Sequence, residues 1–197
     1  MTRFPLASFL LLGLLAVLGT FLVLYSTPQG LALSDDSIGY IAGARSILSG
    51  DGYRAAWLAS NKPVTHFPPG FSSVLALVGL SGLDPLRGTR FVNSLLFGAN
   101  TFLLGLIGWR MTRSKIAGIT LALLFLVNAS LFRVHIAAMS EPLYLFFTLA
   151  SFLTFSQYFE TDKPASSSFS GKLGNPKIWL LLTAFLTSFA YLTRYAG

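Results

Sequence analysis

Long apolar segments with almost no charge constrain the fold of this chain more than any other feature. The first runs from Phe4 to Tyr25, about 22 residues, which at 1.5 Å per residue crosses a hydrocarbon core of roughly 30 Å. No Ala-x-Ala cleavage pattern follows it, so an uncleaved anchor is favoured over a signal peptide. Further segments lie at residues 91–109, 116–132, 142–159 and 178–191. Because a helix satisfies its own backbone polar groups in lipid, the sequence predicts an all-α integral membrane protein with about five transmembrane helices.

The composition narrows the partners of such a chain. Only 11% of its residues are charged while 53% are hydrophobic, and the net charge is +7. Lys and Arg form short clusters between the apolar segments, as they do when they set membrane orientation, and no basic face or aromatic stacking motif accompanies them. We therefore expect membrane lipid as a partner and no nucleic acid. The absence of Cys from the sequence excludes disulfides, thiolate metal sites and a cysteine nucleophile.

A shorter apolar segment at residues 71–83 decides the topology. At about 13 residues it is short for a span, and a Pro-Pro-Gly turn precedes it, so we interpret it as a surface or re-entrant segment. Residues 26–90 then form one external loop, in which we expect juxtamembrane amphipathic helices. The positive-inside rule makes the other side cytoplasmic, because it collects Arg3, Arg110, Arg113, Lys115, Lys163, Lys172 and Lys177.

Two adjacent carboxylates, Asp35 and Asp36, open one of these external helices. Ser34 before them is a good N-cap, and apolar residues at helical spacing follow until Gly50 ends the run. Acids in a first helical turn also interact favourably with the helix dipole, by about 0.3 to 1 kcal/mol, so a purely structural explanation stands beside a functional one. Carboxylates are scarce, with seven Asp and Glu in the whole chain, and most of them fall on the external side.

Four segments carry motifs that occur together in one group of membrane enzymes. Ser34 to Arg45 (Ser-Asp-Asp-Ser-Ile-Gly-Tyr-Ile-Ala-Gly-Ala-Arg) follows the first span, and His66 to Phe71 contains two prolines. Met139 to Leu143 is a second acidic motif, and Leu192 to Tyr195 is a later basic one. In this order the segments resemble the GT-C glycosyltransferases, a superfamily that includes protein O-mannosyltransferases and bacterial aminoarabinose transferases. Each match is weak alone, but together they cover most of the chain.

The resemblance implies an enzyme that moves a sugar from a polyprenyl-phosphate carrier to an acceptor hydroxyl, with inversion at the anomeric carbon. It places the reaction at the extracytoplasmic surface, and we expect the membrane to be the inner (plasma) membrane of a bacterium. The implied partners are the polyprenyl-phosphate-linked sugar and an acceptor, for which lipid, glycan and protein all stay open.

Three carboxylates are the candidate catalytic residues. A hydroxyl is a weak nucleophile until a base accepts its proton, and a positioned carboxylate contributes roughly 10² to 10⁴-fold. The resemblance assigns this role to Asp36, four residues before Tyr40, with Asp35 as the alternative. Glu141 matches the second active-site acid, although an acid before Pro142 also suits the start of a span. If a metal takes part, Asp36 and Glu141 are its expected ligands and Mg²⁺ or Mn²⁺ the expected ion.

Arg194, His66 and Tyr40 are the candidate substrate- and phosphate-binding residues. The leaving group is a lipid phosphate whose negative charge grows as the glycosidic bond breaks, and Arg194 matches the basic residue that the resemblance places against it. Many relatives carry Lys directly before the two prolines, where this chain has Phe67. His66 either compensates for that Lys or is an ordinary solvated loop histidine.

The length of the chain predicts which part of such an enzyme it corresponds to. GT-C enzymes generally have around a dozen spans, so residues 1–197 correspond to the N-terminal part of a multi-span domain. We expect this part to hold half of a catalytic site and to be inactive alone. Two other classes stay open. One is a non-catalytic membrane assembly subunit that keeps the fold, and the other is a transporter, although the sequence shows no internal repeat or paired broken helices to support it.

Overall fold

The structure is a computed structural model that describes residues 6–161 and 175–195. These residues are mostly helical and contain no strand, which confirms the all-α class. Their eight helices are α1 (Leu6–Ser26), α2 (Asp35–Leu48), α3 (Pro69–Gly79), α4 (Pro85–Thr112), α5 (Lys115–Val127), α6 (Ala129–His135), α7 (Glu141–Thr161) and α8 (Pro176–Thr193).

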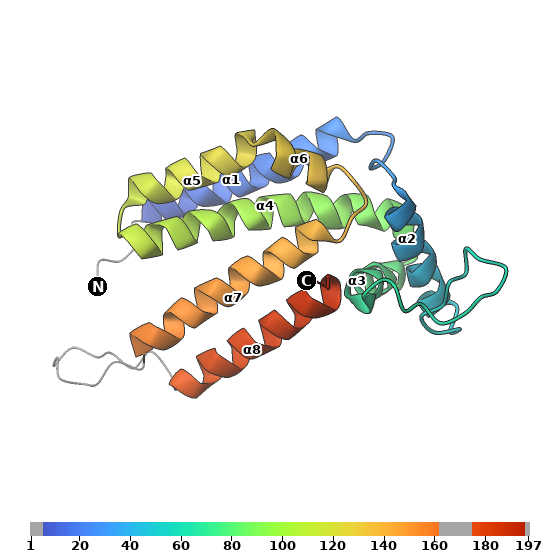
Figure 1. Ribbon diagram of the computed structural model, residues 1–197. Helices are drawn as coiled ribbons and strands as arrows, with labels where there is room; N and C mark the ends of the chain where they lie inside the picture. Colours follow the sequence, from blue (N-terminus) through green and yellow to red (C-terminus); the bar gives the residue numbers. More distant parts are fainter. Residues whose placement is uncertain (1–5, 162–174, 196–197) are drawn as a thin grey trace.

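The longer helices run side by side, and the short helices α2 and α3 lie across one end of the bundle (Figure 1). α1 and α5 pack on α4, and α7 and α8 form an antiparallel pair in which α7 contacts α4. The C-termini of α1 and α8 and the N-termini of α4 and α7 all lie where α2 and α3 sit, which we call the α2–α3 end. Segments far apart in the sequence therefore meet at this end.

Three helices, α1, α4 and α8, are long and apolar enough to span a membrane by length and composition. α5 and α6 meet the same criteria as a pair bent by 64°, which makes up to four such spans among the described residues. The remaining predicted span, at residues 142–159, is α7, which has 21 residues and whose Thr, Ser, Tyr and Gln side chains lower its hydropathy. Some of these polar groups are satisfied inside the protein, as where Thr154 Oγ1 lies 2.9 Å from Thr183 Oγ1 of α8. The membrane class is thus confirmed, with fewer qualifying spans than the predicted five.

Asn128 divides the apolar segment that the sequence presents as one span at residues 116–132. α5 ends at Val127 and α6 begins at Ala129. The Asn128 side chain accepts a hydrogen bond from the backbone N–H of Leu131 at 3.0 Å, so this residue caps α6 instead of continuing α5. The resulting bend turns the chain toward the N-terminus of α7.

Small residues let α1, α4 and α5 pack closely. A Cβ atom at Gly98 of α4 would lie 2.4 Å from the carbonyl oxygen of Ala16 in α1. A Cβ atom at Gly118 of α5 would lie 2.7 Å from the carbonyl oxygen of Gly105 in α4. Without these atoms the backbones come close and gain van der Waals contact, a main driving force for helix association in lipid. These three helices form the frame that supports the site.

α3 is the apolar segment that decided the topology. It has 11 residues, about 16 Å of helix at 1.5 Å per residue, which is too short to cross a bilayer. It packs against α2, α4 and α8, with Phe71 and Leu75 fully buried. This agrees with a surface or re-entrant segment. The same apolar core contains Tyr40 of α2, so α3 also positions a candidate site residue.

Asp84 links the external loop to α4. Its carboxylate accepts hydrogen bonds from Nε and Nη2 of Arg45, both at 3.0 Å, and from the backbone N–H of Leu86 at 2.9 Å, which caps α4. The hydrogen bonds from Arg45 are the main reason why the pKa of Asp84 lies below its ordinary value. Ionised Asp84 therefore makes its full contribution to the free energy of unfolding above its unfolded-state pKa of about 4. This contribution is lost as the pH falls through the lower folded-state pKa.

We expect Asp84→Ala to lower the free energy of unfolding near pH 7 by about 1 to 2 kcal/mol, because it removes a helix cap and an exposed ion pair. Arg45→Met keeps the cap, so it is the matched control, with an expected loss below about 1 kcal/mol. Thermal unfolding in detergent micelles, near pH 7 and near pH 3, measures both. Equal losses in the two variants would contradict the capping role of Asp84.

Candidate active site

The two acidic motifs are joined by their backbones at the α2–α3 end (Figure 1). Ala32, shortly before α2, forms an isolated parallel β-bridge with Ala137, shortly before α7. The N–H of Ala32 donates to the carbonyl oxygen of Ile136 at 2.9 Å, and the N–H of Ala138 donates to the carbonyl oxygen of Ala32 at 2.9 Å. The resemblance implies one site for Asp36 and Glu141, and the structure brings the segments before α2 and α7 together.

Side chains extend this contact to the motifs themselves. The hydroxyls of Tyr40 and Ser140 lie 3.1 Å apart in a buried hydrogen bond. The Ser34 hydroxyl, at the start of α2, donates to Met139 Sδ at 3.1 Å. Asp36 stands one helical turn before Tyr40, and its side chain is exposed. The first turn of α2 is therefore held beside the residue that precedes Glu141.

Glu141 and Arg194 form an ion pair that closes the other side of the site. α8 ends at Thr193, and Arg194 follows in extended backbone, with its Nη1 2.6 Å from Glu141 Oε1. The side chain of Glu141 is 29% exposed and that of Arg194 is 45% exposed. The second carboxylate oxygen, Oε2, is buried and has no hydrogen-bond partner among the described residues. A buried acceptor without a donor favours a ligand or water that supplies one.

The pKa of the Tyr40 hydroxyl depends on the charged side chains around it. Burial raises the pKa of its hydroxyl, the hydrogen bond to Ser140 lowers it, and the negative charges of Glu141 and Asp36 raise it further, while Arg194 acts in the opposite direction. Two acids and one arginine from three separate segments thus act on one hydroxyl. Like a tyrosine of ordinary pKa, Tyr40 is neutral at physiological pH, and its raised pKa extends this to higher pH, so its O–H remains available as a hydrogen-bond donor.

The Pro-Pro segment lies between α2 and the end of α8. The Phe67 ring packs on the Tyr40 ring at a centroid distance of 5.1 Å and covers Gly39, where an added Cβ would lie 2.6 Å from it. A Cβ at Gly70 would lie 2.6 Å from the carbonyl oxygen of Leu192. This segment therefore helps to set where Arg194 emerges from α8.

His66 is exposed at the edge of this segment. It contacts the Phe67 ring edge-on, with centroids 4.9 Å apart, and the described residues offer it no hydrogen bond or ion pair. Its role in phosphate binding stays a prediction. The position before the two prolines serves packing in this chain, since Phe67 fills it with an aromatic ring.

We expect Gly70→Ala to lower stability and to weaken binding of an anionic lipid, because the new Cβ meets the backbone of Leu192 at the end of α8 and has no flexible side chain to displace. The expected cost is about 1 to 3 kcal/mol of overpacking, with a displaced Arg194 as its functional result. Gly13→Ala in α1 is the matched control, since a Cβ there has no neighbour within 4 Å. Thermal unfolding and binding of an anionic lipid, compared for the two variants, measure the effect. Equal behaviour would contradict the proposed contact.

Sequence reasoning missed two asparagines in α4 that hold the second acidic motif. The side-chain N–H of Asn93 donates to the carbonyl oxygen of Ala137 at 2.7 Å, and that of Asn100 donates to the carbonyl oxygen of Pro142 at 3.0 Å. Asn100 also lies 3.2 Å from Nε2 of the fully buried His135. The available signal was the spacing of two Asn by seven residues in an apolar span, because polar side chains inside a membrane helix generally face a partner.

Metal binding by Asp36 and Glu141 stays a prediction. Within residues 6–161 and 175–195, no group of three or more His, Asp or Glu lies close enough to hold an ion. Two carboxylates remain sufficient for Mg²⁺, which keeps several of its waters. The unpartnered Oε2 of Glu141 is an oxygen of the kind that such an ion takes.

The opposite end of the bundle carries a cluster of basic residues. Arg110 and Arg113, at the end of α4, both pair with Glu160 of α7, at 2.8 and 2.6 Å. Lys115 starts α5 at the same end. Arg3, Lys163 and Lys172 lie outside the described residues. Asp36 and Glu141 lie at the α2–α3 end, away from this cluster.

Taken together, the all-α membrane fold and the convergence of the acidic helix α2, a second acidic motif and an arginine are features of the GT-C glycosyltransferase class. The family of dolichyl-phosphate-mannose-protein mannosyltransferases matches residues 79–197, more than half of the chain, and the chain belongs to this family. The match includes Glu141 and Arg194, and it confirms the resemblance that the motifs carry. Searches among curated proteins and among solved structures give no match.

Proposed function

We propose that this protein transfers a mannose-type sugar from a polyprenyl-phosphate carrier to an acceptor hydroxyl at the extracytoplasmic surface of a bacterial inner membrane. Membership of the mannosyltransferase family supports the reaction class and the carrier. The observation that carries the proposal is the ion pair of Glu141 and Arg194 beside Tyr40 and Asp36. In this arrangement two carboxylates, which can accept a proton, lie near a guanidinium, which can bind phosphate. This supports one site for both tasks.

Asp36 is the proposed base. Its exposed carboxylate is reachable by an acceptor hydroxyl, whose oxygen attacks the anomeric carbon as the proton passes to Asp36. The bond between that carbon and the phosphate oxygen breaks in the same displacement, so the configuration at the anomeric carbon inverts. Asp35 lies in the same helical turn and is the alternative base. Tyr40 does not act as a base here, because its raised pKa keeps its proton in place.

Arg194 is the proposed partner of the leaving phosphate. A guanidinium binds phosphate oxygens with charge-assisted hydrogen bonds, and these strengthen as negative charge develops on the leaving group. In the structure Arg194 is engaged by Glu141, so a bound phosphate would compete with that carboxylate for it. Glu141 then orients Arg194 between turnovers and offers its Oε2 to substrate or to a divalent cation.

Transfer of radiolabelled mannose from polyprenyl-phosphate mannose tests the proposal. The full-length protein encoded by the gene is reconstituted in liposomes, and peptide, glycan and lipid acceptors are offered separately. Transfer to one of them, with the product of inverted configuration, is the expected result. Failure with all three, in protein that binds the carrier, would favour the non-catalytic assembly subunit. EDTA added to the same assay, followed by Mg²⁺ or Mn²⁺, tests the predicted metal dependence.

A labelling experiment tests the side of the membrane. The chain has no Cys, so single cysteines report one position each. A membrane-impermeant maleimide added to intact cells should label Asp35→Cys and leave Ser114→Cys, at the opposite end of the bundle, unlabelled until the cells are lysed. The reverse pattern would overturn the extracytoplasmic assignment.

A further inference from the structure

We propose that a cavity between α4 and α7 binds one phospholipid with an anionic headgroup, whose phosphate lies at Arg110 and Arg113. The cavity is at the basic end of the bundle, opposite the α2–α3 end, and the inference does not depend on the proposed function. Its volume of about 400 Å³ is in the range of about 300 to 1,000 Å³ that is typical of ligand pockets. Its lining is mainly apolar and includes Ile107, Met111, Leu149, Phe152, Phe155 and Phe159.

The cavity is as deep as one leaflet of a membrane. Its lining on α7 extends from Phe159, near the end of the helix, back to Leu149. At 1.5 Å per residue this stretch measures about 15 Å, which is half of a hydrocarbon core of roughly 30 Å. An acyl chain of the leaflet at this end therefore reaches the inner end of the cavity while its headgroup stays level with the ends of α4 and α7.

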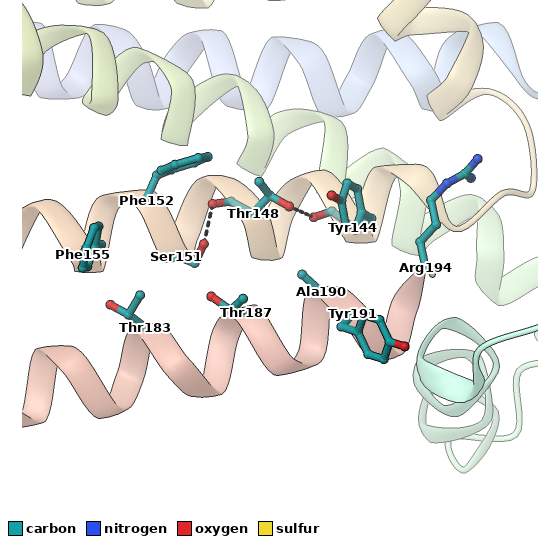
Figure 2. A pocket seen from close by; sticks show the side chains of 10 residues that line it. All are labelled: Tyr144, Thr148, Ser151, Phe152, Phe155, Thr183, Thr187, Ala190, Tyr191 and Arg194. Atoms are coloured by element: carbon teal, nitrogen blue, oxygen red, sulfur yellow. Dashed lines mark hydrogen bonds between the residues drawn. The ribbon is translucent and has the colours of Figure 1, made fainter. Parts of the chain in front are cut away.

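The walls of the cavity suit a hydrocarbon chain that enters from the membrane. Phe152, Phe159 and Met111 are each more than half exposed, whereas Leu149 at the inner end is buried. Figure 2 shows the Phe152 ring on the side of α7 that faces α4. The Ser156 hydroxyl, which also lines the cavity, donates to the carbonyl oxygen of Leu153 at 2.8 Å. An acyl chain thus gains dispersion contacts without covering an unpaired hydroxyl.

The charged rim determines which headgroup fits. Glu160 Oε2 lies 2.8 Å from Nη2 of Arg110, and Glu160 Oε1 lies 2.6 Å from Nη2 of Arg113. Two guanidinium groups thus share one carboxylate, and the three side chains together carry a net charge of +1. Among the described residues, Nε and Nη1 of both arginines have no hydrogen-bond partner. These N–H groups suit the oxygens of a phosphate.

The net positive charge favours an anionic lipid over a zwitterionic one. Both kinds of headgroup carry a phosphate, but a zwitterionic headgroup also brings an ammonium group close to two guanidinium groups. Both arginines lie within one helical turn of the end of α4, and Glu160 is the next-to-last residue of α7. The charges are therefore at the depth where a headgroup lies when its acyl chain fills the cavity.

Native mass spectrometry of the full-length protein in detergent tests the choice of lipid. Delipidated protein is titrated with phosphatidylglycerol or with phosphatidylethanolamine of the same acyl chains, and binding of the first lipid is measured. We expect phosphatidylglycerol to bind about five-fold more tightly, the effect that one positive charge has on an anionic headgroup nearby. Equal affinity for the two lipids would overturn the proposal.

Arg113→Asn tests the proposed phosphate contact. Arg113 follows α4 with a φ of 58°, in the left-handed region, and asparagine adopts this conformation more readily than most residues, so the helix end is kept. We expect the variant to bind phosphatidylglycerol about five-fold more weakly. Lys115→Gln is the control, because it removes a positive charge at the same end from a residue that does not line the cavity, and it should change the affinity by less than about two-fold. Equal losses in the two variants would indicate general electrostatic attraction and overturn the site.

Ser156→Trp tests the acyl-chain position by filling the cavity. Ser188→Trp in α8 is the matched control, since the Ser188 hydroxyl also bonds to its own helix, at 2.8 Å from the carbonyl oxygen of Ala184, and does not line the cavity. We expect Ser156→Trp to weaken binding of phosphatidylglycerol about ten-fold and to abolish the rise in unfolding temperature that this lipid gives the unmodified protein. Cooperative unfolding without lipid shows that the variant is folded. Unchanged binding in folded Ser156→Trp would overturn the proposal.

Competition identifies the occupant. Polyprenyl phosphate, added at the same concentration, should leave the first phosphatidylglycerol bound. Its displacement by polyprenyl phosphate would make the cavity part of a carrier site. A dimer that phosphatidylglycerol dissociates would make the cavity an interface between two copies of the chain. Either outcome would overturn the proposed phospholipid site, and neither depends on whether the protein transfers a sugar.

Discussion

Asp36→Asn is expected to reduce sugar transfer by about 10² to 10⁴-fold, because the amide keeps the shape of the carboxylate but accepts no proton. Asp36 is exposed and makes no contact that α2 needs in order to fold. Expression, membrane insertion and carrier binding should therefore persist. Initial rates of mannose transfer by the reconstituted full-length protein, beside binding of the labelled carrier, measure the effect.

Asp35→Asn is the matched control for this prediction. Both acids lie in the first turn of α2 and are exposed, so their interactions with the helix dipole are similar. Of these two acids, Asp36 alone is among the charges that shift the pKa of the Tyr40 hydroxyl. We expect Asp35→Asn to retain activity within a few-fold. If the two variants lost activity equally, the acids would act through the helix, and if Asp35→Asn alone lost it, Asp35 would be the base.

Arg194→Met is expected to give the second large loss, about 10² to 10³-fold in kcat, since it removes the cation that stabilises the leaving phosphate. It also leaves Glu141 as a half-buried carboxylate without its partner. Arg194→Lys keeps the charge and should recover part of the rate, whereas it loses the planar geometry that suits phosphate. The readout is kcat and KM for the carrier, together with thermal unfolding to separate stability from catalysis.

Arg87→Met is the control for general electrostatics, because Arg87 is an exposed arginine at the α2–α3 end without a role in the site. It should change kcat little. A double-mutant cycle with Glu141→Gln tests the ion pair itself, and the combined loss should be smaller than the product of the single losses. Full activity of Arg194→Met, or losses that multiply independently, would contradict the role assigned to this pair.

Much of the fold follows from hydropathy and turn chemistry. The apolar segments become helices α1, α4, α5, α7 and α8, and the short segment at 71–83 becomes α3. The N-cap at Ser34 and the acids after it mark the start of α2. These features are local, since each depends on residues a few positions apart. The resemblance to GT-C glycosyltransferases assigned Asp36, Glu141 and Arg194 to one site, and in the structure their segments meet at the α2–α3 end.

The contacts that build the site join residues far apart in the sequence. The local sequence around each residue does not predict such contacts. Asn128 bends an apolar run that looks continuous, because its side chain caps a new helix. Asn93 and Asn100 hold the second acidic motif from within a span. A cavity of about 460 Å³ between α7 and α8 (Figure 2) is lined from both helices, for example by Thr148 and Thr183. Such features depend on which helix faces sit together, and hydropathy does not encode that.

A disulfide across the Ala32–Ala137 bridge tests the convergence of the two acidic loops most directly. Paired strands lie about 4.8 Å apart, within the range of Cα separations that a disulfide spans, and the chain has no other Cys. Ala32→Cys with Ala137→Cys, oxidised in membranes, should crosslink rapidly, while Ala32→Cys with Ser114→Cys should not. Rapid crosslinking of the first pair alone is the result that a shared site predicts. A first pair that stays reduced under oxidation would place Asp36 and Glu141 in separate sites and contradict the account.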